Sequence, residues 1–72
     1  MSGKIDPVVS NLIMDIVYRC SNVEEVKDKA QQLAKHVKRH PTSKDTKQFI
    51  ALMLLDREEK ASIVFKAMDA ER

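Results

Sequence analysis

The chain is poor in the residues that break helices, form disulfides and build aromatic cores. Its 72 residues include one cysteine, one glycine, two prolines and no tryptophan. Because Cys20 stands alone, an intrachain disulfide and a cysteine-rich zinc cage are both excluded. Because glycine and proline are scarce, a turn-rich β fold is disfavoured relative to helices. The composition therefore predicts an all-α protein that needs no disulfide.

The chain also lacks a hydrophobic segment long enough to cross a membrane. Its longest apolar run is Phe49 to Leu55, whereas a membrane-spanning helix needs about 20 apolar residues. Asp6 and Asp15 interrupt the apolar residues near the N-terminus, so no secretory signal is expected. The sequence predicts a cytoplasmic protein without a membrane partner.

The overall composition is that of one folded domain. Hydrophobic residues make up 43% of the chain and charged residues 33%, which is typical of a globular protein rather than a disordered one. Seventy-two residues allow a single domain. We expect one helical domain over residues 1–72, with frayed ends at 1–5 and 69–72.

The spacing of apolar residues predicts the first two helices. Asp6-Pro7 is typical of a helix start, because aspartate caps free N–H groups and proline lacks the N–H that would be unpaired. Ser21 with Glu24 three residues later predicts a capping box for a second helix that ends near Arg39. This second helix has a narrow apolar stripe, so we expect it on the outside of the bundle.

The run from Phe49 to Leu55 predicts a third helix that is buried on every side. Thr42 or Ser43 is expected to cap it. Asp56, with a glutamate three residues later, leaves two readings open: a separate fourth helix, or one continuous helix over residues 43–68. The predicted fold is a compact bundle of three to four short helices around this central apolar helix.

Positive charge is concentrated in the middle of the chain. Between Lys27 and Lys47 there are seven lysines and arginines against two aspartates, a local net charge of +5. The candidate residues for binding nucleic acid or an acidic partner are Lys35, Lys38, Arg39, His40, Lys44 and Lys47, which we call the basic corner. A solvated surface without a ligand and a helix-turn-helix remain alternatives, although the connection lacks the usual glycine.

Residues for catalysis or metal binding are few. His36 and His40 share a helix face, but position 37 is valine where a zinc protease has glutamate, and further ligands are scarce. The only glycine is Gly3, so a glycine-rich phosphate loop is excluded. We therefore predict no catalytic residues, no metal and no cofactor, and a protein that is not an enzyme.

Two functional hypotheses follow. The first is a small regulatory or adaptor protein that binds another protein, with homodimer formation also expected, because its apolar faces are wider than so short a chain can enclose. The second is a nucleic-acid-binding module, for DNA or RNA, that contacts phosphates through the basic corner.

Overall fold

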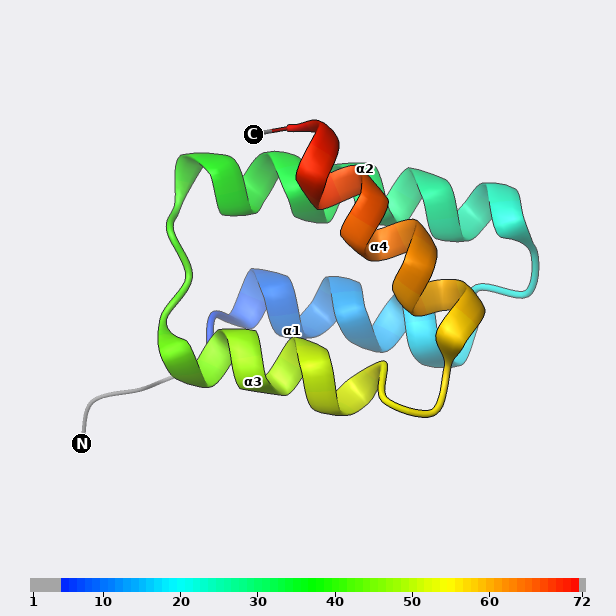
Figure 1. Ribbon diagram of the computed structural model, residues 1–72, viewed down its shortest axis with the longest axis horizontal. Helices are drawn as coiled ribbons and strands as arrows, with labels where there is room; N and C mark the ends of the chain where they lie inside the picture. Colours follow the sequence, from blue (N-terminus) through cyan, green and yellow to red (C-terminus); the bar gives the residue numbers. More distant parts are fainter. Residues whose placement is uncertain (1–4, 72) are drawn as a thin grey trace.

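Four α-helices and one π-helical turn build the protein (Figure 1). The computed structural model describes residues 5–71. Its elements are α1 (Pro7–Met14), the π-helical turn η1 (Asp15–Arg19), α2 (Val23–Arg39), α3 (Lys44–Met53) and α4 (Glu58–Ala70). No strand occurs within residues 5–71. The radius of gyration is 11.2 Å, close to the roughly 11 Å of a compact chain of this length. The predicted all-α bundle is confirmed.

The helices are arranged around α1 and α2. In Figure 1, α1 lies between α2 and α3, and α4 crosses in front of α2. Side chains of all four helices meet in one core, whose fully or almost fully buried members include Val9, Ile13, Ile16, Ala30, Leu33, Ile50, Leu54 and Val64. No α-helix within residues 5–71 combines the length and apolar character needed to span a membrane.

The start of α1 follows the sequence prediction. The Asp6 carboxylate accepts a hydrogen bond from the Val8 N–H at 2.9 Å, and Pro7 occupies the first helical position. The helix continues into η1, where the Cys20 N–H donates to the Asp15 carbonyl at 2.9 Å, a five-residue spacing. The first helical segment thus ends at Arg19.

The cap of α2 lies one residue later than predicted. Asn22, not Ser21, caps the helix and accepts a hydrogen bond from the Glu25 N–H at 2.9 Å. The Glu25 carboxylate in turn accepts from the Ser21 N–H at 3.3 Å. Asn22 and Glu25 have the same three-residue spacing as Ser21 and Glu24, and asparagine caps a helix as well as serine does. The capping box is therefore displaced by one residue.

The junction between α3 and α4 is a real break, so the separate fourth helix is confirmed and the continuous one is wrong. Ser43 caps α3 and accepts from the Thr46 N–H at 3.2 Å, one of the two predicted caps. At the other end, Arg57 donates to the Met53 carbonyl at 3.1 Å and so satisfies the C-terminus of α3. Asp56 was predicted to cap α4, but the capping position is Arg57, without a side-chain bond.

The expectation that residues 49–55 form an entirely buried central helix is wrong. Ile50 and Leu54 are each 2% exposed, but Leu52 is 69% and Leu55 71% exposed. The reason is that α3 packs chiefly against α1, so only one of its faces is covered. As predicted, the second helix buries only a narrow stripe of side chains, and this stripe packs against both α1 and α4. In α4, the large apolar side chain of Phe65 is likewise 48% exposed.

The ends differ in part from the prediction. Helix α4 continues through Ala70, so residues 69 and 70 are helical rather than frayed. The predicted fraying of residues 1–4 and 72 lies outside the described residues.

Candidate functional site

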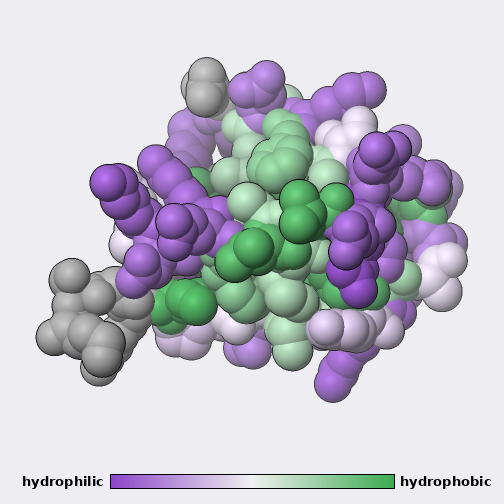
Figure 2. All heavy atoms as spheres, turned by 60° about the horizontal axis from the view of Figure 1, so that its bottom comes forward, coloured by the Kyte–Doolittle hydropathy of each residue, from purple (hydrophilic) through white to green (hydrophobic). Residues whose placement is uncertain are grey.

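Several apolar side chains of α3, α4 and the turn between them lie outside the core and form an apolar face. It comprises Ala51, Leu52, Leu55 and Phe65, all of them exposed. Figure 2 turns α3 toward the viewer and shows a band of hydrophobic side chains across the middle, with hydrophilic side chains beside it. A contiguous apolar patch on a small protein often marks a binding surface. We call these four residues the apolar face.

Local geometry explains why these residues share a side. Residues 51, 52 and 55 fall within about 100° of one another on a helix of 3.6 residues per turn. Although α3 ends at Met53, the Leu55 N–H donates to the Leu52 carbonyl at 3.3 Å, so the chain makes one further turn. Phe65 of α4 lines a hollow together with Lys47 of α3.

That hollow extends the apolar face toward the basic corner. It has a volume of about 380 Å³ and is lined by Val37, Thr42, Lys47, Phe65, Met68 and Asp69. Its walls come from α2, α3, α4 and the connection before α3. The hollow combines an aromatic ring and a thioether with a lysine at its edge, a composition suited to an amphipathic side chain of a partner.

The basic corner lies at the end of the molecule where α2 ends and α3 begins, on the left of Figure 1. All six of its side chains are exposed, and none makes an ion pair with a residue in the described range 5–71. They do not form one uninterrupted positive patch. Lys35, Lys38 and Arg39 share a hollow with Glu71, whereas Lys47 shares another with Asp69.

A helix-turn-helix is not formed by α2 and α3. In Figure 1 the two helices are separated by α1, and α3 packs on α1 rather than on α2. In a helix-turn-helix the first helix supports the second, which places its N-terminal residues in the major groove. Lys44 and Lys47 lie at the start of α3, but α2 does not provide that support.

The two histidines take part in a polar junction. His36 Nε2 lies 2.8 Å from Asp6 Oδ2, and the two imidazole centroids of His36 and His40 are 4.8 Å apart. The Asp6 N–H also donates to the Thr46 hydroxyl at 3.2 Å, so Asp6 links α1, α2 and α3. The hydrogen bond from His36 is the main cause that lowers the pKa of Asp6 below its ordinary value. No group of three or more potential metal ligands gathers within residues 5–71.

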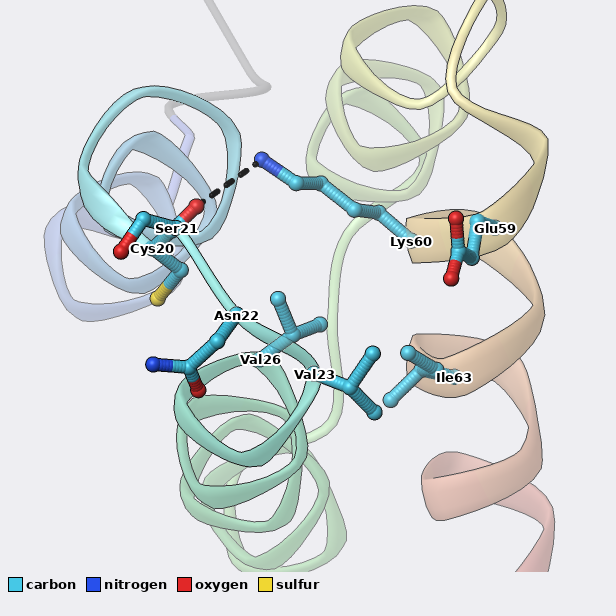
Figure 3. A pocket seen from close by; sticks show the side chains of 8 residues that line it. All are labelled: Cys20, Ser21, Asn22, Val23, Val26, Glu59, Lys60 and Ile63. Atoms are coloured by element: carbon cyan, nitrogen blue, oxygen red, sulfur yellow. Dashed lines mark hydrogen bonds between the residues drawn. The ribbon is translucent and has the colours of Figure 1, made fainter.

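A hollow of about 140 Å³ next to Cys20 contains the groups with the greatest chemical reactivity (Figure 3). Cys20 is 9% exposed, and burial raises the pKa of its thiol, which keeps it in the less reactive protonated form. Lys60 donates to the carbonyls of Ile16, Val17 and Cys20 at 2.7, 3.1 and 3.4 Å. Both groups are thus engaged in the structure of the bundle.

Comparison with known proteins found no family model, no curated protein and no solved structure that matches this chain.

Sequence reasoning missed the apolar face because it treated residues 49–55 as buried on every side. A signal for the exposed side was present. Lys44, Gln48, Ala51 and Leu55 are spaced by four, three and four residues, which places them on one side of a helix that begins with lysine and ends with leucine. A helix side that carries a charged residue and only some apolar ones is typical of a solvent-exposed position.

Proposed function

We propose that this chain is a small, non-enzymatic cytoplasmic protein that acts by binding another polypeptide through its apolar face. The observation that carries this proposal is the exposure of Leu52 and Leu55, 69% and 71% respectively, while Phe65 of α4 is half exposed. When a partner covers large apolar side chains, their removal from water stabilises the complex by about 25 cal/mol per Å² of buried apolar surface. A regulatory or adaptor role is consistent with a surface of this kind.

The interior supports a binding role rather than catalysis. The hollow at Cys20 is small, its thiol is buried, and the Lys60 ammonium is held by three carbonyls. An activated nucleophile would need a nearby base or a depressed pKa, whereas burial moves the pKa of the Cys20 thiol upward.

The proposal is tested by placing a photoreactive amino acid at Leu55 and, as a matched control, at Glu24, an exposed residue of α2. We expect irradiation with cell extract to give an adduct with another polypeptide at position 55 and not at 24. The adduct partner is then purified, and Leu52→Ser should weaken its binding at least tenfold. Equal labelling at both positions, or binding that is insensitive to Leu52→Ser, would overturn the proposal.

Nucleic-acid binding is the second candidate function, favoured by six exposed basic-corner side chains without ion pairs to described residues. It ranks second because Glu71 and Asp69 line the same hollows as the basic side chains. Fluorescence anisotropy against mixed-sequence duplex DNA and single-stranded RNA tests it. Six to ten phosphate contacts lower affinity by about 10³–10⁵ between about 50 and 200 mM salt, so the five cationic side chains of the corner predict a somewhat smaller loss.

The matched control for that experiment replaces Lys38, Arg39 and Lys44 with glutamate. If the basic corner binds phosphates, this variant should lose affinity for both DNA and RNA. Affinity that is unchanged by the replacement, or that does not fall with salt, excludes the corner as the nucleic-acid site.

A further inference from the structure

The outward side of α3 carries a regular stripe of exposed residues. Its members are Lys44, Gln48, Ala51 and Leu55, with spacings of four, three and four residues. The average spacing is close to the 3.6 residues of one helical turn, so the four residues stay on one side of the helix, where a second helix can lie along them. The small side chain of Ala51 lies in the middle of the stripe, where it lets a second helix approach closely. The stripe therefore fits a helix as its occupant.

Charge is distributed unequally along this stripe. Lys44 and Lys47 lie at the N-terminal end of α3, and Asp56 and Glu58 follow its C-terminal end, with the apolar residues between them. All four charged side chains are exposed, and none makes an ion pair with a residue of the described chain. The stripe is thus positive at one end, apolar in the middle and negative at the other end.

Neighbouring charges do not cancel this pattern. Asp45 lies in the first turn of α3, seven residues before Leu52 and on the same helix side, so it offsets one of the two lysines at this end. Arg57 is turned toward its own chain, where it donates to the Met53 carbonyl and lies 5.9 Å from the centroid of the Tyr18 ring. Glu59 lines the hollow beside Cys20. The N-terminal end therefore keeps a net positive charge from Lys44 and Lys47 against Asp45, and the C-terminal end keeps the negative charges of Asp56 and Glu58.

We propose that the occupant of this stripe is the α3 stripe of a second copy of the chain, in antiparallel orientation about a two-fold axis near Ala51. In this arrangement Lys44 and Lys47 of each copy lie near Asp56 and Glu58 of the other, and Leu52 and Leu55 of both copies are covered. A two-fold interface uses the same patch on both subunits, so it needs a patch that is complementary to itself. This proposal rests on the proposed function and names the partner.

Electrostatics favour the antiparallel orientation over the parallel one. A parallel pair would place lysines beside lysines and carboxylates beside carboxylates, which is repulsive. An antiparallel pair also places the positive end of each helix dipole beside the negative end of the other. Because α3 has ten residues and is about 15 Å long, the contact area is at the low end for specific complexes, and the dimer is expected to exchange with monomer.

The test is analytical ultracentrifugation of the full chain from about 5 µM to 1 mM, a range that covers weak association. We expect the wild type to pass reversibly from monomer to dimer over this range. Leu52→Ser/Leu55→Ser should weaken association at least tenfold. The matched control Val23→Ser removes an exposed apolar side chain of α2 and should leave association unchanged. Circular dichroism at low concentration checks that each variant is folded.

Charge exchange tests the orientation. Lys44→Glu/Lys47→Glu and Asp56→Lys/Glu58→Lys should each weaken the dimer, and a chain that combines all four substitutions should recover it. A parallel dimer would not recover in this way, because the combined chain would again place like charges together. Failure of the combined chain to recover overturns the antiparallel arrangement.

The outcomes also separate this proposal from the proposed function. A wild type that stays monomeric up to about 1 mM overturns the dimer. If photo-cross-linking at position 55 then gives an adduct with a different polypeptide, the binding function stands and only the identity of the occupant is wrong. If it gives no adduct, both proposals fail.

Discussion

Helices α1 and α3 are both short and apolar, yet they differ in how much of their apolar surface is covered. In α1, Val9 and Ile13 are completely buried, because α2 packs on one side of the helix and α3 on another. In α3, Ile50 is buried but Leu52 is 69% exposed, because α1 is its main neighbour. The number of neighbouring helices thus limits how many faces of a helix become core.

The comparison predicts a large loss of stability when a buried isoleucine of α1 is truncated and a small one when an exposed leucine of α3 is replaced. Ile13→Ala removes methyl groups from a fully buried position and should reduce the free energy of unfolding by about 2–5 kcal/mol. This is a large part of the total stability of a small domain. Urea denaturation followed by circular dichroism measures it. A loss below about 1 kcal/mol would show that α1 is not the closed centre of the bundle.

The C-terminal end of the first helical segment is stabilised by a lysine of α4. Lys60→Met removes the donor to the carbonyls of Ile16, Val17 and Cys20, while it keeps most of the aliphatic side chain. Since hydrogen bonds to charged groups contribute about 1.5–3 kcal/mol, we expect a loss in that range by denaturant titration. The matched variant Lys66→Met changes an exposed lysine of the same helix and should have little effect. Equal losses would disprove the capping role.

The polar junction at the N-terminal end of α1 should contribute less to the stability of the fold in acid. Because the folded state holds the pKa of Asp6 below its ordinary value of 3.8, chiefly through the His36 hydrogen bond, its ionised form stabilises the fold. That stabilisation is present above pH 3.8 and is lost as the pH falls through the lower folded value. Thermal unfolding between about pH 5 and 2 measures it.

The control for the acid prediction is Asp6→Asn, which keeps a helix-capping side chain but has no ionisable carboxyl. The unfolding temperature of the wild type should fall more steeply with acid than that of this variant. Parallel pH profiles would mean that the Asp6–His36 contact does not couple folding to protonation.

The smallest effect on the folded monomer is expected at the apolar face. Leu52→Ser replaces a side chain that is mostly in water, so the free energy of unfolding at low protein concentration should change by no more than about 0.5 kcal/mol. Denaturation at about 5 µM, where a weak dimer is dissociated, measures it. A loss comparable with that of Ile13→Ala would mean that α3 is covered on this side within the monomer, and the comparison of the two helices would be wrong.

Much of the local structure could be predicted from sequence because it depends on short-range contacts. Asp6 and Pro7 start α1, and Ser43 caps α3, since each acts on backbone groups within three residues. The break before α4 was found for a partly different reason: Asp56 was the expected cap, whereas Arg57 occupies that position and bridges back to Met53. The pattern therefore allowed a break at this point, but the residue at the capping position differs from the expected one.

The candidate site was predicted less well. The basic corner was identified as six residues, and the fold does bring them to one end of the bundle, but it divides them between hollows that also contain Glu71 and Asp69. Both acidic residues belong to the C-terminal end of the chain, distant in sequence from the lysines. Their proximity depends on the path of α4 across α2, which no local pattern encodes.

The sequence by itself determined that this protein is helical, where its helices begin, and that it has more apolar side chains than a few short helices can cover. These properties follow from backbone capping, side-chain spacing and composition, which act over a few residues. Only the tertiary structure decided which apolar side chains are left outside. Leu52 and Leu55 are exposed because α4 turns away to pack on α2, so the outward side of α3 has no neighbour within the described chain.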